Sequence, residues 1–306
     1  MASVDTNVAR WLLDGDPAIR WQTMRDLTSE PAEVVARERS RVASEGWGRA
    51  LLDRQAPQGW WNSNDRGWMI TMDALALLRE MGLDPSSDEA RRAVARVKAN
   101  LRWESLGNRP YFDGETEACI NGAILAFGSY FGERCDRIVD RLLGEQLADG
   151  GWNCEAPPST RSSFNSTIRV LEGLLEHERA WGSSTAVSDA RRKAHEYLLE
   201  RHMFRRLSTG EVVQADWTLF TFPTSWRYDV LRGLDYLQGA AVKPDERVAE
   251  AVGIVEGRRR EDGRWLMDHL HADRLGFLLE ETGKESRWNT LRALRVLRWY
   301  SGPLDG

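Results

Sequence analysis

Residues 20–27 read Arg-Trp-Gln-Thr-Met-Arg-Asp-Leu, and residues 287–294 read Arg-Trp-Asn-Thr-Leu-Arg-Ala-Leu. These two stretches are the closest internal match in the chain, and they lie near its two ends. Self-similarity of this kind indicates a repeat architecture, in which each copy builds one structural unit. Because the first and last copies resemble each other most, we expect them to meet and to close a ring.

In the register of this match, a mostly small residue recurs about 50–60 residues apart along the chain. The positions of this column are Asp26, Ala76, Ala126, Gly173, Gly233 and Ala293. A large apolar residue always follows, and another apolar residue stands two positions earlier, as in Leu231 and Leu234. A spacing of three or four positions on one face predicts a helix. Small residues in the column would let neighbouring inner helices approach closely, and Asp26 is the exception.

Between these inner helices the pattern predicts outer helices, for example over residues 139–146 and 248–259. Each of these two is followed by a glycine turn, around Gly150 and Gly263, which we interpret as a helix C-terminus. Residues 179–188 contain Gly-Ser-Ser and are predicted to form an insertion loop. The sequence therefore predicts one all-α domain over residues 1–306, an (α/α)6 toroid of six helical hairpins around a central pocket.

The composition argues against several classes of partner. Lys and Arg number 42 against 47 Asp and Glu, so the formal net charge is −5 and gives no reason to bind nucleic acid. No apolar run is long enough to span a bilayer, and the first residues lack the pattern of a signal peptide. The three cysteines show no Cys-x-x-Cys spacing. We expect a cytoplasmic protein with reduced thiols, no transmembrane segment and an oligomeric state that the sequence leaves open.

One turn carries a family resemblance. Residues 146–153, Gln-Leu-Ala-Asp-Gly-Gly-Trp-Asn, resemble the QW repeat of squalene and terpenoid cyclases, in which a Gln and a Trp around a glycine turn tie outer helices together. Gln55 with Gly59-Trp60, and residues 260–265, look like weaker copies. Together with the inner helices, these turns make the whole chain resemble the squalene-cyclase/prenyltransferase-like α/α-toroid family. The resemblance implies a toroid whose central pocket holds a hydrophobic molecule.

The reactive motifs of that family are missing from the sequence. Neither Asp-x-Asp-Asp, with which class II cyclases protonate their substrate, nor the magnesium-binding Asp-Asp-x-x-Asp of class I enzymes occurs. Protein prenyltransferases hold zinc with an Asp-x-Cys motif and a His, whereas here Glu117 precedes Cys119. His269 and His271 would diverge on a helix, and no third ligand is evident. We therefore predict no metal and no cofactor.

Polar residues at the starts of the inner helices would ring the mouth of the pocket. The carboxylates predicted to act as acid or base are Asp229, Asp73 and Glu117. Desolvation in an aromatic pocket raises the pKa of such a group and suits it to donate a proton near neutral pH. The predicted ligand-binding residues are Trp21, Trp61, Trp68, Asn121, Asn165, Arg169, Trp226, Tyr228, Arg287, Trp288 and Asn289. Aromatic walls with a few polar groups are typical of small-molecule pockets and stabilise cations.

Each assignment has a structural alternative. The aromatic residues also suit packing between helices, and Arg169 with Asp229 also suits a structural ion pair. Arginines on the last two inner helices either grip an anionic group or pair with the preceding glutamates. Two functional hypotheses follow: an enzyme that cyclises or isomerises a hydrophobic or aromatic small molecule by acid–base chemistry, or a non-catalytic protein that sequesters a natural product. A sugar-processing hydrolase or lyase is a third, weaker option.

Overall fold

The computed structural model describes residues 5–61, 67–270, 275–276 and 278–302. Within these ranges, helices dominate, and the strands are antiparallel pairs of two-residue strands. The pairs are β1 (Arg102–Trp103) with β2 (Arg109–Pro110), and β3 (Trp265–Leu266) with β4 (Glu285–Ser286). The predicted all-α class is confirmed. The chain divides into two compact units, and the predicted single domain over residues 1–306 stays a prediction.

The first unit consists of Met1–Trp47 and Leu198–Gly306, so it joins both ends of the chain. Its helices are α1 (Thr6–Leu13), α2 (Pro17–Thr23), α3 (Ala32–Ser40), α11 (Val230–Gly239), α12 (Ala249–Gly257) and α13 (Arg287–Tyr300). A π-helical turn, Met24–Thr28, continues α2. Helix α4 (Gly46–Leu52) begins in this unit and leads into the next.

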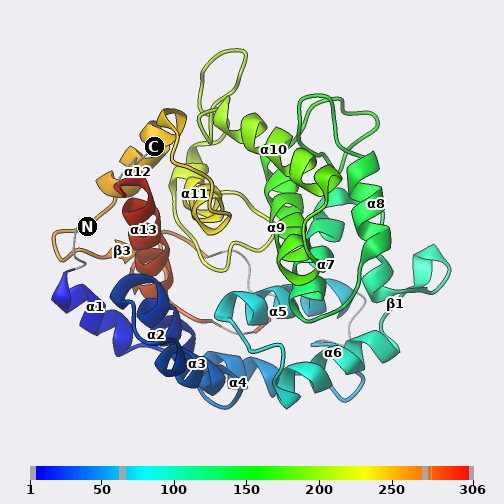
Figure 1. The fold of residues 1–306 in the computed structure, drawn as a ribbon, viewed down its shortest axis with the longest axis horizontal. Helices are drawn as coiled ribbons and strands as arrows, with labels where there is room; N and C mark the ends of the chain where they lie inside the picture. Colours follow the sequence, from blue (N-terminus) through cyan, green and yellow to red (C-terminus); the bar gives the residue numbers. More distant parts are fainter. Residues whose placement is uncertain (1–4, 62–66, 271–274, 277, 303–306) are drawn as a thin grey trace. The chain divides into compact units, whose positions relative to one another are not determined.

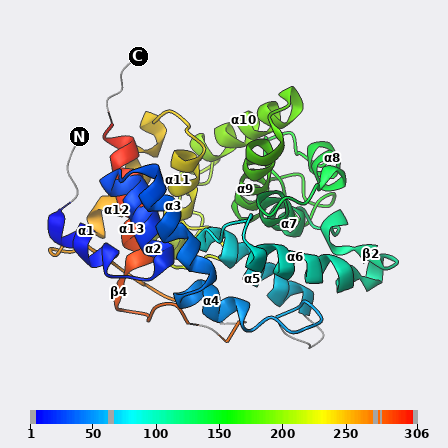
Figure 2. The same ribbon diagram turned by 60° about the horizontal axis from the view of Figure 1, so that its bottom comes forward.

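The two matching stretches at the ends of the sequence lie side by side in this unit. Helix α13 packs between α2 and α11, as Figures 1 and 2 show. The guanidinium of Arg295 lies 2.6 Å from Oδ2 of Asp26, and Arg298 donates a hydrogen bond of 2.7 Å to the carbonyl oxygen of Asp26. The expected contact between the first and last inner helices is confirmed.

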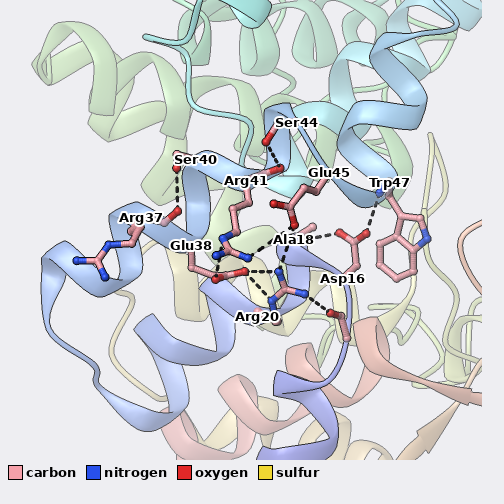
Figure 3. Close-up of polar contacts among 11 residues, drawn as sticks. Asp16, Ala18, Arg20, Arg37, Glu38, Ser40, Arg41, Ser44, Glu45 and Trp47 are labelled. Carbon is pink, nitrogen blue, oxygen red and sulfur yellow. Dashed lines mark hydrogen bonds and ion pairs between the residues drawn. The ribbon is translucent and has the colours of Figure 1, made fainter.

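A polar cluster holds the entry into α2 (Figure 3). Asp16 is the N-cap of α2, a position that Asp favours because its carboxylate accepts an otherwise unpaired backbone N–H. Its oxygens accept hydrogen bonds from the backbone N–H of Ala18 at 2.9 Å and of Trp47 at 2.7 Å. Burial raises the pKa of Asp16, although these two hydrogen bonds act to lower it. Beside it, Arg20 donates a hydrogen bond of 2.6 Å to Glu38 of α3, which ties α2 to α3.

The second unit is Gly48–Tyr197. Its further helices are α5 (Gly67–Met81), α6 (Asp88–Asn100), α7 (Ala118–Tyr130), α8 (Asp136–Gly144), α9 (Phe164–Trp181) and α10 (Thr185–Leu199), whose last residues reach the first unit. Helices α7 and α9 lie against each other (Figure 1). A methyl group added at Gly173 would lie 2.5 Å from the carbonyl oxygen of Gly122. The small residue in the repeat column is therefore what permits this close approach.

The glycine turn after α8 is fixed by the two residues that suggested the QW resemblance. Gln146 donates hydrogen bonds of 2.8 Å to the carbonyl oxygens of Gly150, in its own turn, and of Ala190, in α10. The indole N–H of Trp152 donates a bond of 2.7 Å to the carbonyl oxygen of Leu142 at the end of α8. The turn thus joins α8 to α10 through hydrogen bonds to backbone carbonyl oxygens of both helices.

Two other turns repeat this pattern. The indole N–H groups of Trp61 and Trp265 each donate to a carbonyl oxygen of the preceding helix, Leu51 at 2.7 Å and Val255 at 2.8 Å. Trp61, rather than the adjacent Trp60, is thus the counterpart of Trp152. In the turn that contains Trp61, the side-chain amide of Gln55 donates hydrogen bonds to the carbonyl oxygens of Gly59 and Ala93, as Gln146 does in its own turn.

Three boundaries differ from the sequence prediction. Helices α8 and α12 end at Gly144 and Gly257, before the glycine turns that were expected to end them. Gly150 and Gly263 instead adopt positive φ angles, 96° and 79°, inside separate turns. The predicted insertion loop over residues 179–188 is mostly helical, because α9 runs to Trp181 and α10 begins at Thr185. The hydroxyl of Ser184 there caps α10 by accepting a hydrogen bond of 3.3 Å from the backbone N–H of Val187.

Candidate functional site

Asp229 is the most deeply buried of the three predicted catalytic carboxylates, with 3% of its surface exposed. It is the N-cap of α11, and its Oδ1 accepts a hydrogen bond of 2.7 Å from the backbone N–H of Arg232. Its Oδ2 is buried and has no hydrogen-bond partner among the residues that the structure describes. The two oxygens of one carboxyl group therefore have different roles.

Burial raises the pKa of Asp229. The Arg292 guanidinium, the backbone N–H and charge of Arg232, and His269 oppose this shift without cancelling it. Because Oδ1 already accepts an N–H, a proton on this carboxyl group belongs on Oδ2. Burial thus favours the protonated form of this carboxyl group more than in an ordinary aspartate.

Aromatic rings, called the aromatic wall below, pack beside Arg292, whose charge also acts on Asp229. Trp288, with 1% of its surface exposed, stacks on Phe222 with ring centroids 4.0 Å apart and an interplanar angle of 16°. The ring centroid of Trp47 lies 6.3 Å from that of Trp288, with an interplanar angle of 24°. The Arg292 guanidinium lies 5.9 Å from the centre of the Phe222 ring. The indole nitrogen of Trp288 is buried without a hydrogen-bond partner among the described residues.

Asn289 follows Trp288 in α13 and is fully buried. Its Nδ2 donates hydrogen bonds to the carbonyl oxygens of Leu266 at 2.9 Å and Phe220 at 3.2 Å. Within the described part of the chain its Oδ1 has no partner, and neither does the hydroxyl of Thr221. Buried polar atoms are nearly always paired. This set around the segment 220–222 is therefore suited to bind the polar groups of a ligand.

Two acidic residues of the first unit did not figure among the sequence candidates. Asp235 of α11 lies 3.5 Å from the guanidinium of Arg292, and burial raises its pKa. Burial also raises the pKa of Glu280, which accepts a bond of 2.5 Å from the Ser286 hydroxyl and one of 2.7 Å from the backbone N–H of Arg287. The sequence signal for Asp235 was an acidic residue in the stretch 230–237, whose other members apart from Arg232 are apolar or glycine.

Trp21 and Trp226, both predicted to bind a ligand, contact arginines. Arg25 and Arg39 lie over the ring of the buried Trp21, at 4.6 and 5.3 Å from its centre. Trp226 is 41% exposed, and the guanidinium of Arg227 lies 5.1 Å from its ring centre. These contacts follow the packing alternative for both residues.

Tyr228 and Arg287 are likewise engaged with their own unit. The hydroxyl of the buried Tyr228 donates a hydrogen bond of 2.7 Å to the carbonyl oxygen of Met203. Arg287 donates to the carbonyl oxygen of Trp11 at 3.1 Å, and its guanidinium lies 4.5 Å from that ring's centre. Of the candidates in the first unit, Trp288 and Asn289 both contact the segment 220–222, and Arg292 lies near both Asp229 and Phe222 of that segment.

In the second unit, Trp61 belongs to its turn, and Trp68 packs against Trp103 with ring centroids 5.2 Å apart. The Tyr111 hydroxyl donates a hydrogen bond of 3.0 Å to the carbonyl oxygen of Trp68. Burial, and then the nearby charge of Asp73, raise the pKa of Tyr111. Asp73 is half-buried in α5 and lies near Tyr111.

Asn121 and Glu117 lie at the start of α7, where their environments differ. Both ends of the buried Asn121 amide bind the backbone of Glu115, with Oδ1 accepting at 2.7 Å and Nδ2 donating at 2.9 Å. Glu117 is exposed, so the desolvation expected for a catalytic acid does not apply to it. Arg169 is buried in α9 and Asn165 half-buried. The ion pair of Arg169 with Asp229 stays a prediction.

Among the described residues, Glu117, Cys119 and Cys154 bring three potential metal ligands within 4.8 Å of one another. Thiolates with a carboxylate are a donor set that zinc accepts. The predicted absence of a metal therefore stays a prediction. Of the His-x-His pair, His269 lies near Asp229, and His271 lies outside the described residues.

A surface cavity of about 310 Å³ opens on the second unit. Its lining includes Lys98, Tyr111, Phe112 and Glu133, and no residue predicted from the sequence to bind a ligand. Over the described part of the chain, no helix combines the length and apolar character needed to cross a membrane.

No protein-family model and no curated protein matches this chain. Among solved structures, it is similar to the type II terpene cyclase MstE from Scytonema, at 17% identity and a TM-score of 0.45, over 92% of this chain and 87% of that one. A variant of MstE in complex with geranylgeranyl dihydroxybenzoate matches at 17% identity and 0.45, over 92% and 85%. Another, in complex with merosterolic acid A, matches at 15% identity and 0.45, over 92% and 86%.

Proposed function

We propose that this chain is an enzyme that acts on a hydrophobic or aromatic small molecule, with Asp229 as its general acid. The observation that supports this proposal most directly is the difference between the two oxygens of the Asp229 carboxyl group. Oδ1 is held by the backbone N–H of Arg232, while Oδ2 is buried and has no partner among the described residues. An ordinary aspartate is ionised at neutral pH. The raised pKa of Asp229 supports a neutral carboxyl group that can donate a proton.

In the proposed reaction, the proton on Oδ2 moves to a carbon–carbon double bond of the substrate. The positive charge then lies on the substrate, where an aromatic face turned toward it would stabilise it. Asp229 is left as a carboxylate, which the nearby charge of Arg292 favours. Loss of a proton from the rearranged cation gives an isomer or a cyclised product of unchanged mass, and Asp229 regains a proton from solvent.

The partnerless atoms also suggest how a substrate would be oriented. The indole N–H of Trp288 requires an acceptor, and Oδ1 of Asn289 requires a donor. A hydroxyl group can supply either role. An apolar molecule that carries hydroxyl groups therefore fits both the aromatic wall and its polar atoms.

The second candidate function is binding without turnover. Its support is that Asp229 already serves as the N-cap of α11, which alone explains an aspartate at this position. The sequence also lacks the Asp-x-Asp-Asp motif. In this reading the same aromatic wall sequesters the small molecule unchanged.

The test begins with mass spectrometry of any compound that co-purifies with the chain, followed by turnover assays with it. Geranylgeranyl dihydroxybenzoate, a prenylated aromatic acid, is a defined first probe. We expect Asp229→Asn to lower turnover by about 10²–10⁴ while the compound still binds. Asp245→Asn, which changes another half-buried aspartate that caps a helical turn, is the matched control and should keep turnover within a few fold of the parent.

Asp229→Asn that turns over like the parent would contradict the role of Asp229. If the compound binds to the parent, to Asp229→Asn and to Asp245→Asn without any change of the compound, the binding function replaces the enzymatic one.

A further inference from the structure

Two of the three cysteines meet in the second unit, at a place that the proposed function does not use. Cys119 is in the first turn of α7, and Cys154 lies in the loop between α8 and α9. The backbone N–H of Cys119 donates a hydrogen bond of 3.2 Å to Sγ of Cys154. The hydroxyl of Ser166, in α9, donates to the same sulfur at 3.3 Å. Two separate helices therefore direct donors at one sulfur atom.

The charges around the pair make the two thiols unequal. The Cys119 thiol donates a hydrogen bond of 3.7 Å to Oε2 of Glu117, whereas the sulfur of Cys154 accepts from the Cys119 backbone and from Ser166. The contact with Cys154, burial and the charge of Glu117 raise the pKa of Cys119. Glu117 thus holds the proton of Cys119, and the sulfur of Cys154 is the one that donors surround.

The third cysteine provides a contrast within the same unit. Cys135 is 2% exposed, and burial, with the nearby Glu133, raises its pKa to about 12. Cys119 and Cys154 are both half-buried, so reagents have access to them. Reactive cysteines are those that combine thiolate character with exposure.

We propose that Cys154 is a nucleophilic thiol and Cys119 its resolving partner, and that the pair exchanges with small-molecule disulfides. The Cys154 thiolate attacks one sulfur of the disulfide, which forms a mixed disulfide and expels a thiolate. That thiolate takes the proton from Cys119. The Cys119 thiolate then attacks Sγ of Cys154 and expels the second small thiolate, which takes a proton from solvent. The net result is one protein disulfide and two small thiols.

The geometry supports the second step as well as the first. The two sulfur atoms and the Glu117 carboxylate lie within 4.8 Å of one another, so the resolving attack needs only a local adjustment. The resulting bond would link the start of α7 to the loop before α9. A protein that carries such a pair gains a site of reversible covalent modification.

The experiment follows limited alkylation of the native chain by iodoacetamide from pH 5 to pH 9, read by peptide mass spectrometry. We expect Cys154 to be labelled about 10-fold faster than Cys135 near pH 7, since rate follows the thiolate fraction. Ser166→Ala should shift the pH profile of Cys154 labelling upward, because a donor to the thiolate is lost. A rise in Cys119 or Cys135 labelling before Cys154 overturns the proposal.

A second arm uses glutathione disulfide. The parent should form the internal Cys119–Cys154 disulfide, and Cys119→Ser should stop at a stable glutathione adduct on Cys154. Cys135→Ser, the matched control, should behave like the parent. A stable adduct in the parent, no reaction of Cys154, or zinc that co-purifies and protects both thiols contradicts the proposal.

Discussion

Arg295, in the last helix of the chain, donates a hydrogen bond of 2.6 Å to the side-chain oxygen of Gln22 and lies 2.6 Å from Oδ2 of Asp26. Asp26 is the one charged member of a column that is otherwise small. The contact explains the exception, because Asp26 faces the arginines of α13. Burial alone would raise the pKa of Asp26, but Arg295 and Arg25 outweigh it and hold that pKa below its usual value.

Asp26→Asn should lower the free energy of unfolding by about 1–3 kcal/mol at pH 7, the usual cost of losing a hydrogen bond to a charged group. A carboxylate whose pKa is lower in the folded state stabilises fully above the unfolded value, near 3.9. That contribution is lost as the pH falls through the folded value. Urea unfolding should therefore show the gap between parent and variant closing on acidification.

The matched control is Asp53→Asn, which removes an exposed partner of Arg49 and should change stability little. A gap for Asp26→Asn that stays the same from pH 7 to pH 3 would show that its charge is not what stabilises the two ends.

Gly173→Ala tests the contact between α7 and α9. Its new methyl group would lie 2.5 Å from a backbone oxygen, so the helices must move apart. We expect a loss of about 1–3 kcal/mol, as for other overpacked cores. Gly253→Ala in α12 meets no atom within 4 Å and should instead stabilise by about 0.5–1 kcal/mol. Equal effects of the two variants in thermal unfolding would disprove the close approach.

Gln146→Ala tests the turn that joins α8 to α10. It removes two hydrogen bonds and leaves two carbonyl oxygens without their partner, so we expect a loss of about 1–3 kcal/mol. Gln55→Ala should behave alike, because its amide makes the equivalent bonds. Gln58→Ala, an exposed glutamine of the same turn as Gln55, should be neutral in denaturant unfolding.

The repeat made the fold accessible from sequence. The column at Gly173 and Gly233 placed the inner helices, and the end-to-end match placed α2 against α13. Helix ends were harder, because a glycine that ends a helix and a glycine that forms a separate turn look alike in sequence. Gly150 is of the second kind, since α8 ends at Gly144. Local signals cannot separate the two cases without the hydrogen bonds of Gln146.

The candidate site was only partly predictable. Asp229, Trp288 and Asn289 stood at the expected helix starts, because N-terminal positions follow from the repeat register. Whether a polar atom already has a partner depends on residues far away in sequence. For example, the Tyr228 hydroxyl donates a hydrogen bond to the carbonyl oxygen of Met203. The contact between Cys119 and Cys154 depends on a loop whose path cannot be predicted from the spacing of the cysteines.

Asp229→Asn should make the protein more stable at pH 7–8, not less. Burial raises the pKa of the native group, so between the unfolded value near 3.9 and the raised folded value the folded state holds a proton that the unfolded state has released. Stability falls as the pH rises through that window and stays lower above it. Asparagine keeps the N-cap bond to Arg232 without the charge. The advantage in melting temperature should shrink as the pH approaches 4, and Asp229→Ala should lose about 1 kcal/mol by comparison.

The most direct test of Asp229 as an acid is its own titration. Carbon-13 NMR of the side-chain carboxyl groups of the full chain, with the signal assigned by its loss in Asp229→Asn, reports the protonation state without any substrate. Our account predicts a midpoint above the ordinary aspartate value of about 3.9, with a neutral carboxyl group over the pH range of activity. A midpoint at or below that value would mean that Asp229 is a charged helix cap, and it would contradict its role as the proton donor.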